Sequence, residues 1–496
     1  MPQHRLSKSR FMSGNQCHLR LWYDVHERHL MPPIIEVQQA TFNTGHEVGD
    51  LARERYPGGH LIAQDYRNIP AALAETQRLI EADTAAALFE PAFQHDNVLS
   101  RVDVLERLPD GGWRMVEVKS TTRCKDEHIL DAAVQLWVLR GAGLDVQDAG
   151  VLTLNRDYIY DGLRLDLDAL FKFHPVLDEA DALLESVGAD VVDMQAMLAA
   201  DDAPDIAPGQ HCLKPYVCPY YEHCTQDTPQ PEHGIGELNG IRINRREELE
   251  AMGITEVRDV PGGFPLNRLQ SIIHQSVRDG RDTVHGDLAS SLAEITPPVR
   301  HLDFETFQPA IPRFAGTRPY DQIPFLFSVH KETYGRPPEH TEYMHEDNSD
   351  PRPLLVEWLL EALGGEGSIC VYSRFERIQL NALAAAFPQY ANALEDIIAR
   401  LVDLLPIVRS GYYHPGFRGS FSLKSVLPII APGMGYDDLE VADGRMASVW
   451  YARAVATADA GERRQIFDNL RAYCARDTLA MVELRKALMA LAHGCG

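Results

Sequence analysis

The spacing of hydrophobic residues changes several times within the first 228 positions. TFNTGHEVGDLARERY (41–56) has the 3.6-residue spacing of an amphipathic helix, and a second helical stretch follows at about 127–141. Short apolar runs between and after these stretches are typical of strands. The runs are ALFEPAF (87–93), VLSRVDVLERL (98–108), WRMVEVKSTT (113–122) and AGVLTLN (149–155).

The turn sequence PDGG (109–112) separates two of the predicted strands. Asp-Gly and Gly-Gly pairs close tight hairpins, so the runs on either side should pair antiparallel. Glu117 and Lys119 stand two residues apart and therefore share one face of their strand. Pairing across the hairpin would bring Asp103 beside them.

A second set of strand-like runs follows residue 298, and the chain is mostly helical after it. These runs are HLDFETF (301–307), FLFSVHKE (325–332) and SICVYS (368–373). The order of elements in both blocks predicts an α/β fold class with mixed sheets.

Two proline-rich breaks divide the sequence, TQDTPQPEHG (225–234) and EITPPVR (294–300). We predict three domains, residues 1–228, 229–297 and 298–496, of which the middle one is a small helical connector. A chain of 496 residues is long enough for about three cores, at roughly 100 to 200 residues per domain.

Composition narrows the class of protein. Hydrophobic content is 45%, and we find no apolar run of about 18 residues or more, so no membrane association is expected. The basic N-terminus lacks the apolar stretch of a secretory signal, which favours the cytoplasm. A net charge of −25 disfavours wrapping of nucleic acid by the whole surface. It is compatible with a nuclease, because metal-binding carboxylates contribute to the negative count.

Asp103, Glu117 and Lys119 form the first candidate site. Carboxylates held close together repel each other unless a cation lies between them, and a hard divalent ion such as Mg²⁺ or Mn²⁺ suits oxygen ligands. Such an ion activates water, and we expect the lysine to orient that water rather than to form an ion pair with Glu117. The alternative is a surface salt bridge on a strand edge.

The order of acid, hairpin and Glu-Val-Lys resembles the RecB-like branch of the PD-(D/E)xK nucleases, on a restriction-endonuclease-like mixed-sheet domain. The resemblance implies a helical glutamine, which Gln135 supplies, and an upstream histidine ligand, which we assign to His46. His46 fits a capping or packing role equally well. Leu139 departs from the pattern, where an aromatic residue is expected, although Trp137 is close.

Three cysteines recur at six-residue steps, Cys212, Cys218 and Cys224, and Cys17 lies about 195 residues before them. The spacing is wider than that of common zinc sites. An N-terminal cysteine joined to a late trio resembles the iron–sulfur RecB-like nucleases, which implies a 4Fe-4S cluster on these four thiols. The other cysteines have no partner at ligand spacing and are expected to be plain thiols: Cys124, Cys370, Cys474 and Cys495.

Asp303 and Glu305, two residues apart in HLDFETF, form the second candidate site. Near the C-terminus, Tyr473 and Asp477 share one face of a predicted helix. Two like charges on one strand face require a metal ion or solvent, and an edge strand exposed to water is the alternative interpretation.

Together these residues resemble the tyrosine-bearing DEDD-type, DnaQ-like exonucleases on the ribonuclease H-like fold. The resemblance implies that Asp303, Glu305 and Asp477 hold two divalent ions and that Tyr473 orients the attacking water. For the fourth acid we favour Glu376, with Asp403 as the competitor.

Glu376 departs from the family pattern, because the family more often has Asn-x-x-Phe-Asp where this chain has Ser373 and Glu376. Lys424 is a candidate phosphate contact, although a lone lysine is more often solvated.

Residues 234–263 loosely resemble a helix-hairpin-helix, with Arg242, Arg245 and Arg246 as local positive charge. A purely structural linker fits equally well. The whole chain resembles a bacterial group in which a RecB-like nuclease is fused to a C-terminal domain of unknown function with exonuclease-like motifs.

We therefore expect a metal-dependent deoxyribonuclease with two hydrolytic sites, acting in DNA processing, repair or defence on DNA that is single-stranded or has free ends. RNA is not excluded as a substrate. The alternatives are one active site with the other degenerate, or a non-catalytic iron–sulfur scaffold that binds nucleic acid.

Overall fold

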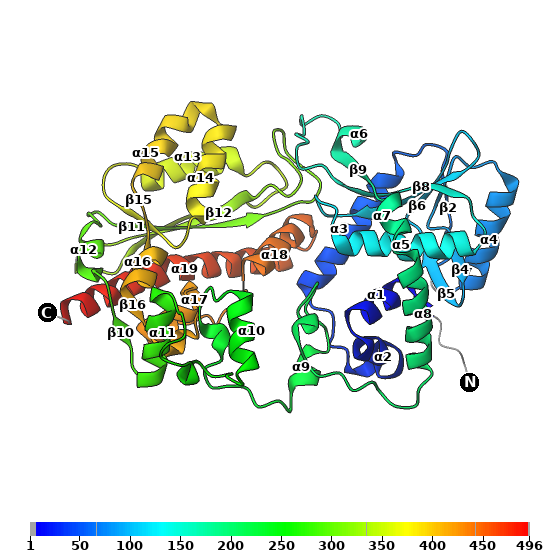
Figure 1. The fold of residues 1–496 in the computed structure, drawn as a ribbon. Helices are drawn as coiled ribbons and strands as arrows, with labels where there is room; N and C mark the ends of the chain where they lie inside the picture. The colour runs from blue at the N-terminus through cyan, green and yellow to red at the C-terminus, as the bar shows by residue number, and fades with distance from the viewer. Residues whose placement is uncertain (1–5, 66, 334, 442, 495–496) are drawn as a thin grey trace. The chain divides into compact units, whose positions relative to one another are not determined.

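The computed structural model describes residues 6–65, 67–333, 335–441 and 443–494. By its internal contacts the chain divides into two units, whose elements are labelled in Figure 1. Unit 1 comprises the residues up to Thr228 together with Pro309–Asp321. Unit 2 comprises Pro229–Gln308 and the residues from Gln322 onward, so the predicted connector is part of unit 2.

The helices and strands of unit 1 alternate along the chain. They are β1 (Leu6–Ser7), α1 (Lys8–Gln16), α2 (His18–His26), η1 (Arg28–Leu30), α3 (Glu36–Arg53), β2 (His60–Leu61), α4 (Ile69–Ala82), β3 (Ala87–Phe89), β4 (Ala92–His95), β5 (Val98–Arg101), β6 (Val104–Arg107), β7 (Trp113–Lys119), α5 (Asp126–Gly141), β8 (Val146–Leu154), α6 (Leu167–Leu170), β9 (Phe171–Pro175), α7 (Leu177–Asp181), α8 (Leu184–Leu198), η2 (Gln210–Cys212) and α9 (Tyr221–Thr225).

A mixed six-stranded sheet in the order β2-β3-β6-β7-β8-β9 lies at the centre of unit 1. β6 and β7 form the predicted antiparallel hairpin, with Val104 opposite Val116 and Arg107 opposite Trp113. Gly111 in the turn has a φ of +98°, a conformation that favours glycine. β8 lies parallel to β7 on its other side.

Side chains of β7 alternate between two apolar layers. Trp113 and Met115 pack in the core that includes α5, whereas Val116 packs with Val48 of α3. Glu117 follows Met115 at strand spacing and therefore lies on the side of α5. This alternation explains why a helix on that side can bring polar groups to Glu117.

The predicted strand at 98–108 is wrong, because the chain forms two strands there. β5 belongs to a separate three-stranded sheet, β1-β5-β4, and β6 belongs to the six-stranded sheet. At the change of sheet, the Val102 amide donates to the Pro91 carbonyl at 3.1 Å. Asp103 lies in the gap, where its Oδ2 accepts the Val118 amide at 2.6 Å. The strand-like pattern of VLSRVDVLERL carries no signal for such a switch between sheets.

The segment Pro309–Asp321 packs in unit 1, although it comes from the connection between two strands of unit 2. Ala310 and Tyr320 lie in the same apolar cluster as Phe171. The Tyr320 hydroxyl also donates to the Ser120 carbonyl, directly after β7.

Unit 2 is built from shorter strands and many helices. They are η3 (Ile235–Glu237), α10 (Ile243–Ala251), η4 (Val257–Asp259), α11 (Arg268–Asp279), β10 (Thr283–Val284), α12 (Leu288–Ala293), β11 (Arg300–Phe307), β12 (Ile323–Lys331), β13 (Glu339–Met344), α13 (Arg352–Leu363), β14 (Ile369–Val371), α14 (Phe375–Ala386), η5 (Pro388–Tyr390), α15 (Ala391–Ala399), β15 (Leu401–Asp403), α16 (Leu404–Gly411), β16 (Tyr412–Tyr413), η6 (Pro415–Phe417), α17 (Leu423–Ile430), α18 (Gly444–Ala456) and α19 (Ala460–Gly494).

A mixed five-stranded sheet in the order β13-β12-β11-β14-β15 organises unit 2. β11 is antiparallel to β12 and parallel to β14. Helices α13, α14 and α15 cover one face, and α18 and α19 lie on the other (Figure 1). Leu302 and Phe304 pack toward α13–α15. Asp303 and Glu305 alternate with them and therefore face α19.

The connector helices share their core with the C-terminal block. Leu249 of α10 and Ile273 of α11 pack in one cluster with Phe417 and Leu484. The fold class is α/β with several mixed sheets, as predicted. Among the described residues, no helix has both the length and the apolar composition needed to cross a membrane.

Candidate metal centres

Glu117 is the centre of the polar cluster in unit 1. Its carboxylate is buried, with a relative exposure of 2%. Lys119 Nζ donates to Glu117 Oε1 at 2.7 Å, and Gln135 Nε2 of α5 donates to Glu117 Oε2 at 2.8 Å. The structure thus places Lys119 and Gln135 on the predicted carboxylate, with Asp103 at the neighbouring break between strands.

Two further residues belong to this cluster and were missed by sequence reasoning. Lys8 Nζ at the start of α1 lies 2.7 Å from Glu117 Oε1 and 3.3 Å from Asp131 Oδ1. Asp131 also pairs with Lys119. Asp131 stands four residues before Gln135, on the same face of α5, so helical spacing could have found it. No local signal marks Lys8, which lies 109 residues from Glu117.

The two acids of the prediction respond oppositely to this environment. Burial and the Glu117 charge raise the pKa of Asp103 to about 8. Burial alone would raise the pKa of Glu117, but Lys119 and Lys8 outweigh it and hold that pKa well below its usual range. Glu117 is therefore a carboxylate at neutral pH, whereas Asp103 is mostly protonated.

Lys119 forms an ion pair with Glu117. We had expected the lysine to orient a water molecule and not to pair with this carboxylate. Among the described residues, Asp103, Glu117 and Asp131 do not offer three oxygens within 4.8 Å of one another. The physical reason is that both lysines lie between Glu117 and Asp131.

The structure does not bring His46 to these carboxylates. His46 lies in the interior of α3 with an exposed side chain. In the described residues it makes no hydrogen bond or ion pair with Asp103 or Glu117. The buried face of α3 contains Val48 and Ala52. His46 lies on another face of the helix, away from the sheet.

The four cysteines of the predicted cluster come near one another within unit 1. Burial and the charges of Cys218, Cys212 and Cys17 raise the pKa of Cys224, so all four sulfurs are within electrostatic range. Gln16, the last residue of α1, contacts the segment that carries the three later cysteines. Its Nε2 donates to the His211 carbonyl at 2.8 Å. The structure thus brings together thiols about 195 residues apart in sequence.

The four thiols are not grouped as closely as the ligands of a single ion. Ligands of one tetrahedral zinc ion lie about 3.8 Å apart, given a Zn–S distance of ~2.3 Å. Among the described residues, no three of the four cysteine sulfurs lie within 4.8 Å of one another. In a 4Fe-4S cluster each thiolate binds a separate iron, which requires wider spacing. All four cysteines are free of disulfides.

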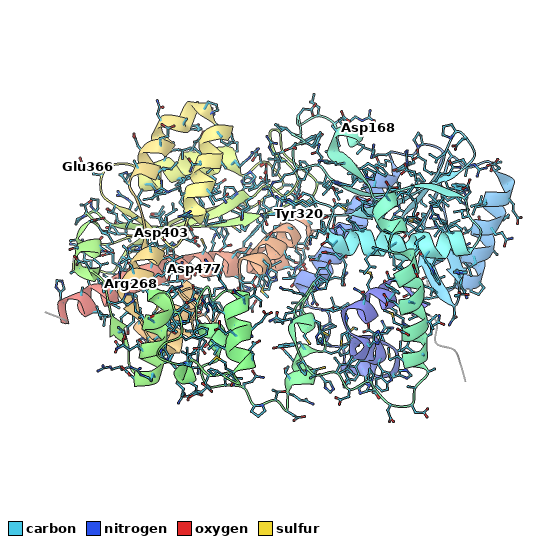
Figure 2. All side chains as sticks on the ribbon, viewed as in Figure 1. Asp168, Arg268, Tyr320, Glu366, Asp403 and Asp477 are labelled. Carbon is cyan, nitrogen blue, oxygen red and sulfur yellow. The ribbon has the colours of Figure 1, made fainter. Side chains whose placement is uncertain are left out.

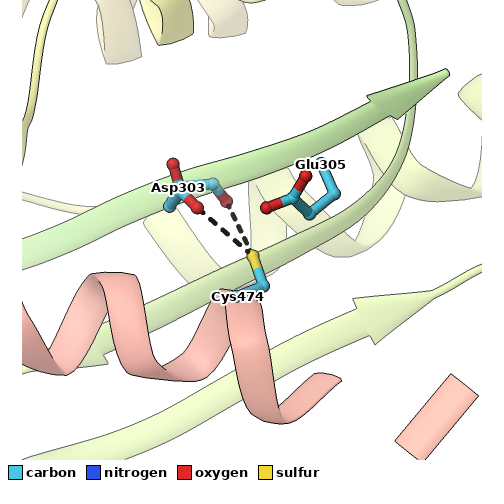
Figure 3. A group of neighbouring side chains, drawn as sticks. All are labelled: Asp303, Glu305 and Cys474. Carbon is cyan, nitrogen blue, oxygen red and sulfur yellow. Dashed lines mark hydrogen bonds between the residues drawn. The ribbon is translucent and has the colours of Figure 1, made fainter. Parts of the chain in front are cut away.

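In unit 2, Asp303, Glu305 and Cys474 form a close group of potential ligands (Figure 3). Their oxygen and sulfur atoms all lie within 4.8 Å of one another. Cys474 Sγ is 3.5 Å from Asp303 Oδ2 and 3.8 Å from the Asp303 carbonyl. The two acids come from β11 and the thiol from α19. Sequence reasoning missed Cys474, although it directly follows Tyr473.

Helix α19 also brings Tyr473 and Asp477 to this site. Tyr436 Oη donates to Asp477 Oδ1 at 2.5 Å. Lys424 Nζ lies 4.8 Å from the centre of the Tyr473 ring and 5.2 Å from that of Tyr436. Lys424 is therefore beside the acids instead of being solvated alone.

All four acids of the second site are held against ionisation. Burial and the Asp477 charge raise the pKa of Asp303 to about 8. Burial, followed by the charge of Asp303, raises the pKa of Glu305 and of Glu376 well above the usual range. Burial also raises the pKa of Asp477. A cluster of this kind favours a divalent cation, because the cation removes the repulsion.

The two candidates for the fourth acid have different places. Glu376 is buried at the start of α14 and interacts with Asp303, and its Oε2 has no hydrogen-bond partner. Asp403 lies at the start of α16, whereas Asp477 lies on α19 (Figure 2). Asp403 Oδ1 accepts the amides of Leu405 and Ser373 at 3.0 and 2.9 Å, so it caps the helix.

Two of the connector arginines pair within their own helix. Arg245 pairs with Glu248 and Arg246 with Glu250, both at 2.8 Å. Arg242 stands at the N-cap of α10 with an exposed side chain. Much of the local positive charge is thus compensated.

Comparison with known proteins gives one family match. Residues 300–422 match the model of a family described as a domain of unknown function, DUF2779. The match includes Asp303, Glu305 and Glu376 and ends before Tyr473, Cys474 and Asp477.

Eight chains of solved structures also match. One, described as "Crystal structure of SSO0001", is 11% identical, with 30% of this chain and 84% of that chain covered and a TM-score of 0.14. A similarity this low supports no argument. No curated protein matches the chain.

Proposed function

We propose that the chain is a metal-dependent nuclease that hydrolyses phosphodiester bonds of DNA, with one hydrolytic site in each unit. The observation that carries the proposal is the close approach of Asp303 and Glu305 of β11, whose carboxylate oxygens lie within 4.8 Å of each other, with Asp477 of α19 near enough to raise the pKa of both. This geometry supports the resemblance to DnaQ-like exonucleases. The hairpin and helix around Glu117 support the resemblance to RecB-like nucleases.

In unit 2, Asp303, Glu305, Asp477 and Glu376 would hold Mg²⁺ or Mn²⁺. A bound divalent ion supplies a Lewis acid and a water of lowered pKa. The Tyr473 hydroxyl hydrogen-bonds Asp477 and would orient that water. Lys424 adds positive charge beside the acids, which favours a phosphate.

In unit 1, Asp103 and Glu117 would hold the same type of ion. Gln135 fixes the orientation of Glu117 through a 2.8 Å hydrogen bond. Lys119 and Lys8 carry positive charge directly at the carboxylate, which suits stabilisation of charge on a phosphate.

The substrate we propose is DNA that is single-stranded or has free ends, in the cytoplasm. The net charge of −25 opposes binding over the whole surface, so local lysines and bound cations must provide the attraction. Binding should therefore weaken as salt increases.

The experiment is a cleavage assay on end-labelled single- and double-stranded DNA, with RNA as a comparison, in Mg²⁺ or Mn²⁺. Glu117→Ala and Asp303→Ala are tested singly and together. We expect each single variant to lose one activity, by about 100-fold or more, and the double variant to lose both. Asp168→Ala, at an exposed acid, is the matched control.

Two other outcomes would change this proposal. If only one variant affects cleavage, the site in the other unit is degenerate. We expect the degenerate site to be that of unit 2, because Glu376 has one methylene more than the aspartate of the family pattern. If the cluster-loaded protein binds DNA and cleaves nothing, the nuclease proposal is wrong and a nucleic-acid-binding scaffold takes its place.

A further inference from the structure

Cys474 gives the second site a ligand that hard-metal nuclease chemistry does not need. Its side chain is fully buried, and its sulfur points at a carboxylate instead of only apolar groups (Figure 3). Glu305 from β11 completes the group. Two oxygens and one sulfur therefore surround a common point.

The spacing of these atoms matches ligands of a single ion. With metal–sulfur and metal–oxygen distances of about 2.3 and 2.1 Å, two ligands of a tetrahedral ion lie about 3.5 Å apart. Cys474 Sγ and Asp303 Oδ2 are separated by 3.5 Å. Only small shifts would be needed to bind an ion between them.

A second observation points to a cation at this place. Glu376 is 2% exposed and interacts with Asp303, and its Oε2 has no hydrogen-bond partner among the residues that the structure describes. A buried carboxylate oxygen without a partner is costly unless a cation or a donor approaches it.

The chemistry of the donor set decides which cation. Carboxylates alone favour Mg²⁺ or Mn²⁺, whereas a thiolate adds strong preference for soft or borderline ions such as Zn²⁺ and Cd²⁺. On binding, the Cys474 S–H bond breaks, a sulfur–metal bond forms, and the proton passes to solvent.

We propose that Asp303, Glu305 and Cys474 form a binding site for a thiophilic divalent ion, Zn²⁺ or Cd²⁺, which excludes Mg²⁺ and Mn²⁺ from unit 2 and inhibits its reaction. The inhibitory part rests on the proposed nuclease function, and the binding part does not. The reason for inhibition is that one ion would take the two carboxylates that the reaction also requires.

Cadmium binding to the full-length, cluster-loaded protein tests the site directly. Titration by equilibrium dialysis, with the ultraviolet absorption of cadmium–thiolate bonds as a second readout, compares the wild type with Cys474→Ser. The cluster thiols contribute equally to both proteins. We expect Cys474→Ser to lose one bound Cd²⁺, or to bind it at least about tenfold more weakly, since even an outer partner of a metal ligand contributes that much.

Cys370→Ser is the matched control, because Cys370 is also buried in unit 2. It should keep the full stoichiometry. Asp303→Asn leaves the thiol in place and should weaken binding at the same site. It provides an independent test if the cysteine variant misfolds. Equal stoichiometry and affinity in wild type, Cys474→Ser and Asp303→Asn would overturn the proposal.

Cleavage assays distinguish failure of this inference from failure of the nuclease proposal. Micromolar Cd²⁺ or Zn²⁺ added to a Mn²⁺ reaction should abolish the unit 2 activity of a Glu117→Ala protein. If that activity persists while the site is shown to be filled, inhibition is wrong. If no variant cleaves DNA but the Cys474-dependent site remains, the nuclease proposal alone fails.

Discussion

At the scale of single residues, Lys8 adds most to the first site. Its ammonium contacts Glu117 and Asp131, and these contacts keep its own pKa above the usual range in spite of burial. Lys8 is therefore charged at neutral pH. Together with Lys119 it balances buried negative charge that would otherwise oppose folding of the site.

Replacing Lys8 by methionine should reduce cleavage by unit 1, because Glu117 loses one of the two cations that hold it. We expect kcat/KM to fall by about 100-fold in an Asp303→Ala background, within the range of positioned polar groups in catalysis. The measurement is a steady-state assay on end-labelled DNA at several Mn²⁺ concentrations.

Lys125→Met is the control, since Lys125 is exposed near the start of α5 and its ammonium pairs with Glu127. Lys8→Arg should recover part of the activity through its retained charge. Equal activity of Lys8→Met and Lys125→Met would show that Lys8 has no positioning role.

Some residues of the first site follow from local sequence motifs, and others do not. Glu117, Lys119 and Gln135 could be predicted because their spacing follows strand and helix periods. Lys8 could not, because its contact depends on how α1 packs. His46 fits its motif in sequence, yet α3 leaves it exposed.

At the scale of elements, β11 and α19 build the second site together. The strand presents alternate residues to α19, and the helix presents residues three and four apart to the strand. The strand period and the helix period could both be predicted from the sequence, and so could the shared helix face of Tyr473 and Asp477. Cys474 lies between Tyr473 and Asp477 in the sequence. Its contact with Asp303 depends on the close approach of α19 to β11.

The packing of α19 on β12 predicts sensitivity to acid. His330 is 7% exposed, stacks on His340 with ring centres 4.4 Å apart, and contacts Thr478 Oγ1 at 2.7 Å. Burial, with the neighbouring His340 and His301, lowers the pKa of His330 to about 4. In the unfolded chain its pKa is about 6.5.

Between pH 6.5 and 4 the unfolded state therefore binds a proton at His330 that the folded state does not bind. This contribution to stability is complete above about pH 6.5 and is lost as the pH falls to about 4. We expect the urea midpoint of unit 2 to fall over this range, and to fall less in His330→Asn. Fluorescence of Trp358 and Trp450 follows the transition.

His29→Asn, at an exposed histidine, should keep the wild-type dependence on pH. If His330→Asn and His29→Asn show the same slope, burial of His330 does not contribute to acid sensitivity.

At the scale of the whole molecule, contacts between distant segments hold unit 1 together. Cys17, Cys212, Cys218 and Cys224, which we call the cysteine group, come from segments about 195 residues apart. Gln16 hydrogen-bonds between the same segments. Closing a loop of that length costs about 5 kcal/mol of chain entropy. A cluster bound only by the folded chain would offset that cost.

A cluster on these thiols predicts a brown protein with bound iron. Cys218→Ser should lose the colour and most of the iron and should lower the thermal midpoint of unit 1 by several degrees. Iron analysis, visible absorption and thermal denaturation measure these effects on anaerobically purified protein.

Cys124→Ser, outside the cysteine group, should retain the colour and the iron. A colourless anaerobic preparation of the wild type that contains zinc would contradict the assignment to iron and sulfur.

The sequence by itself determined the α/β class, the hairpin at PDGG and the pairs that share a strand or helix face, because periodicity and turn chemistry are local. It also provided both groups of carboxylates. Only the tertiary structure decided that residues 98–108 split between two sheets, that the connector joins the core of unit 2, and that Lys8 and Cys474 reach the acids. Such contacts are set by the packing of segments far apart in the chain, which no local pattern encodes.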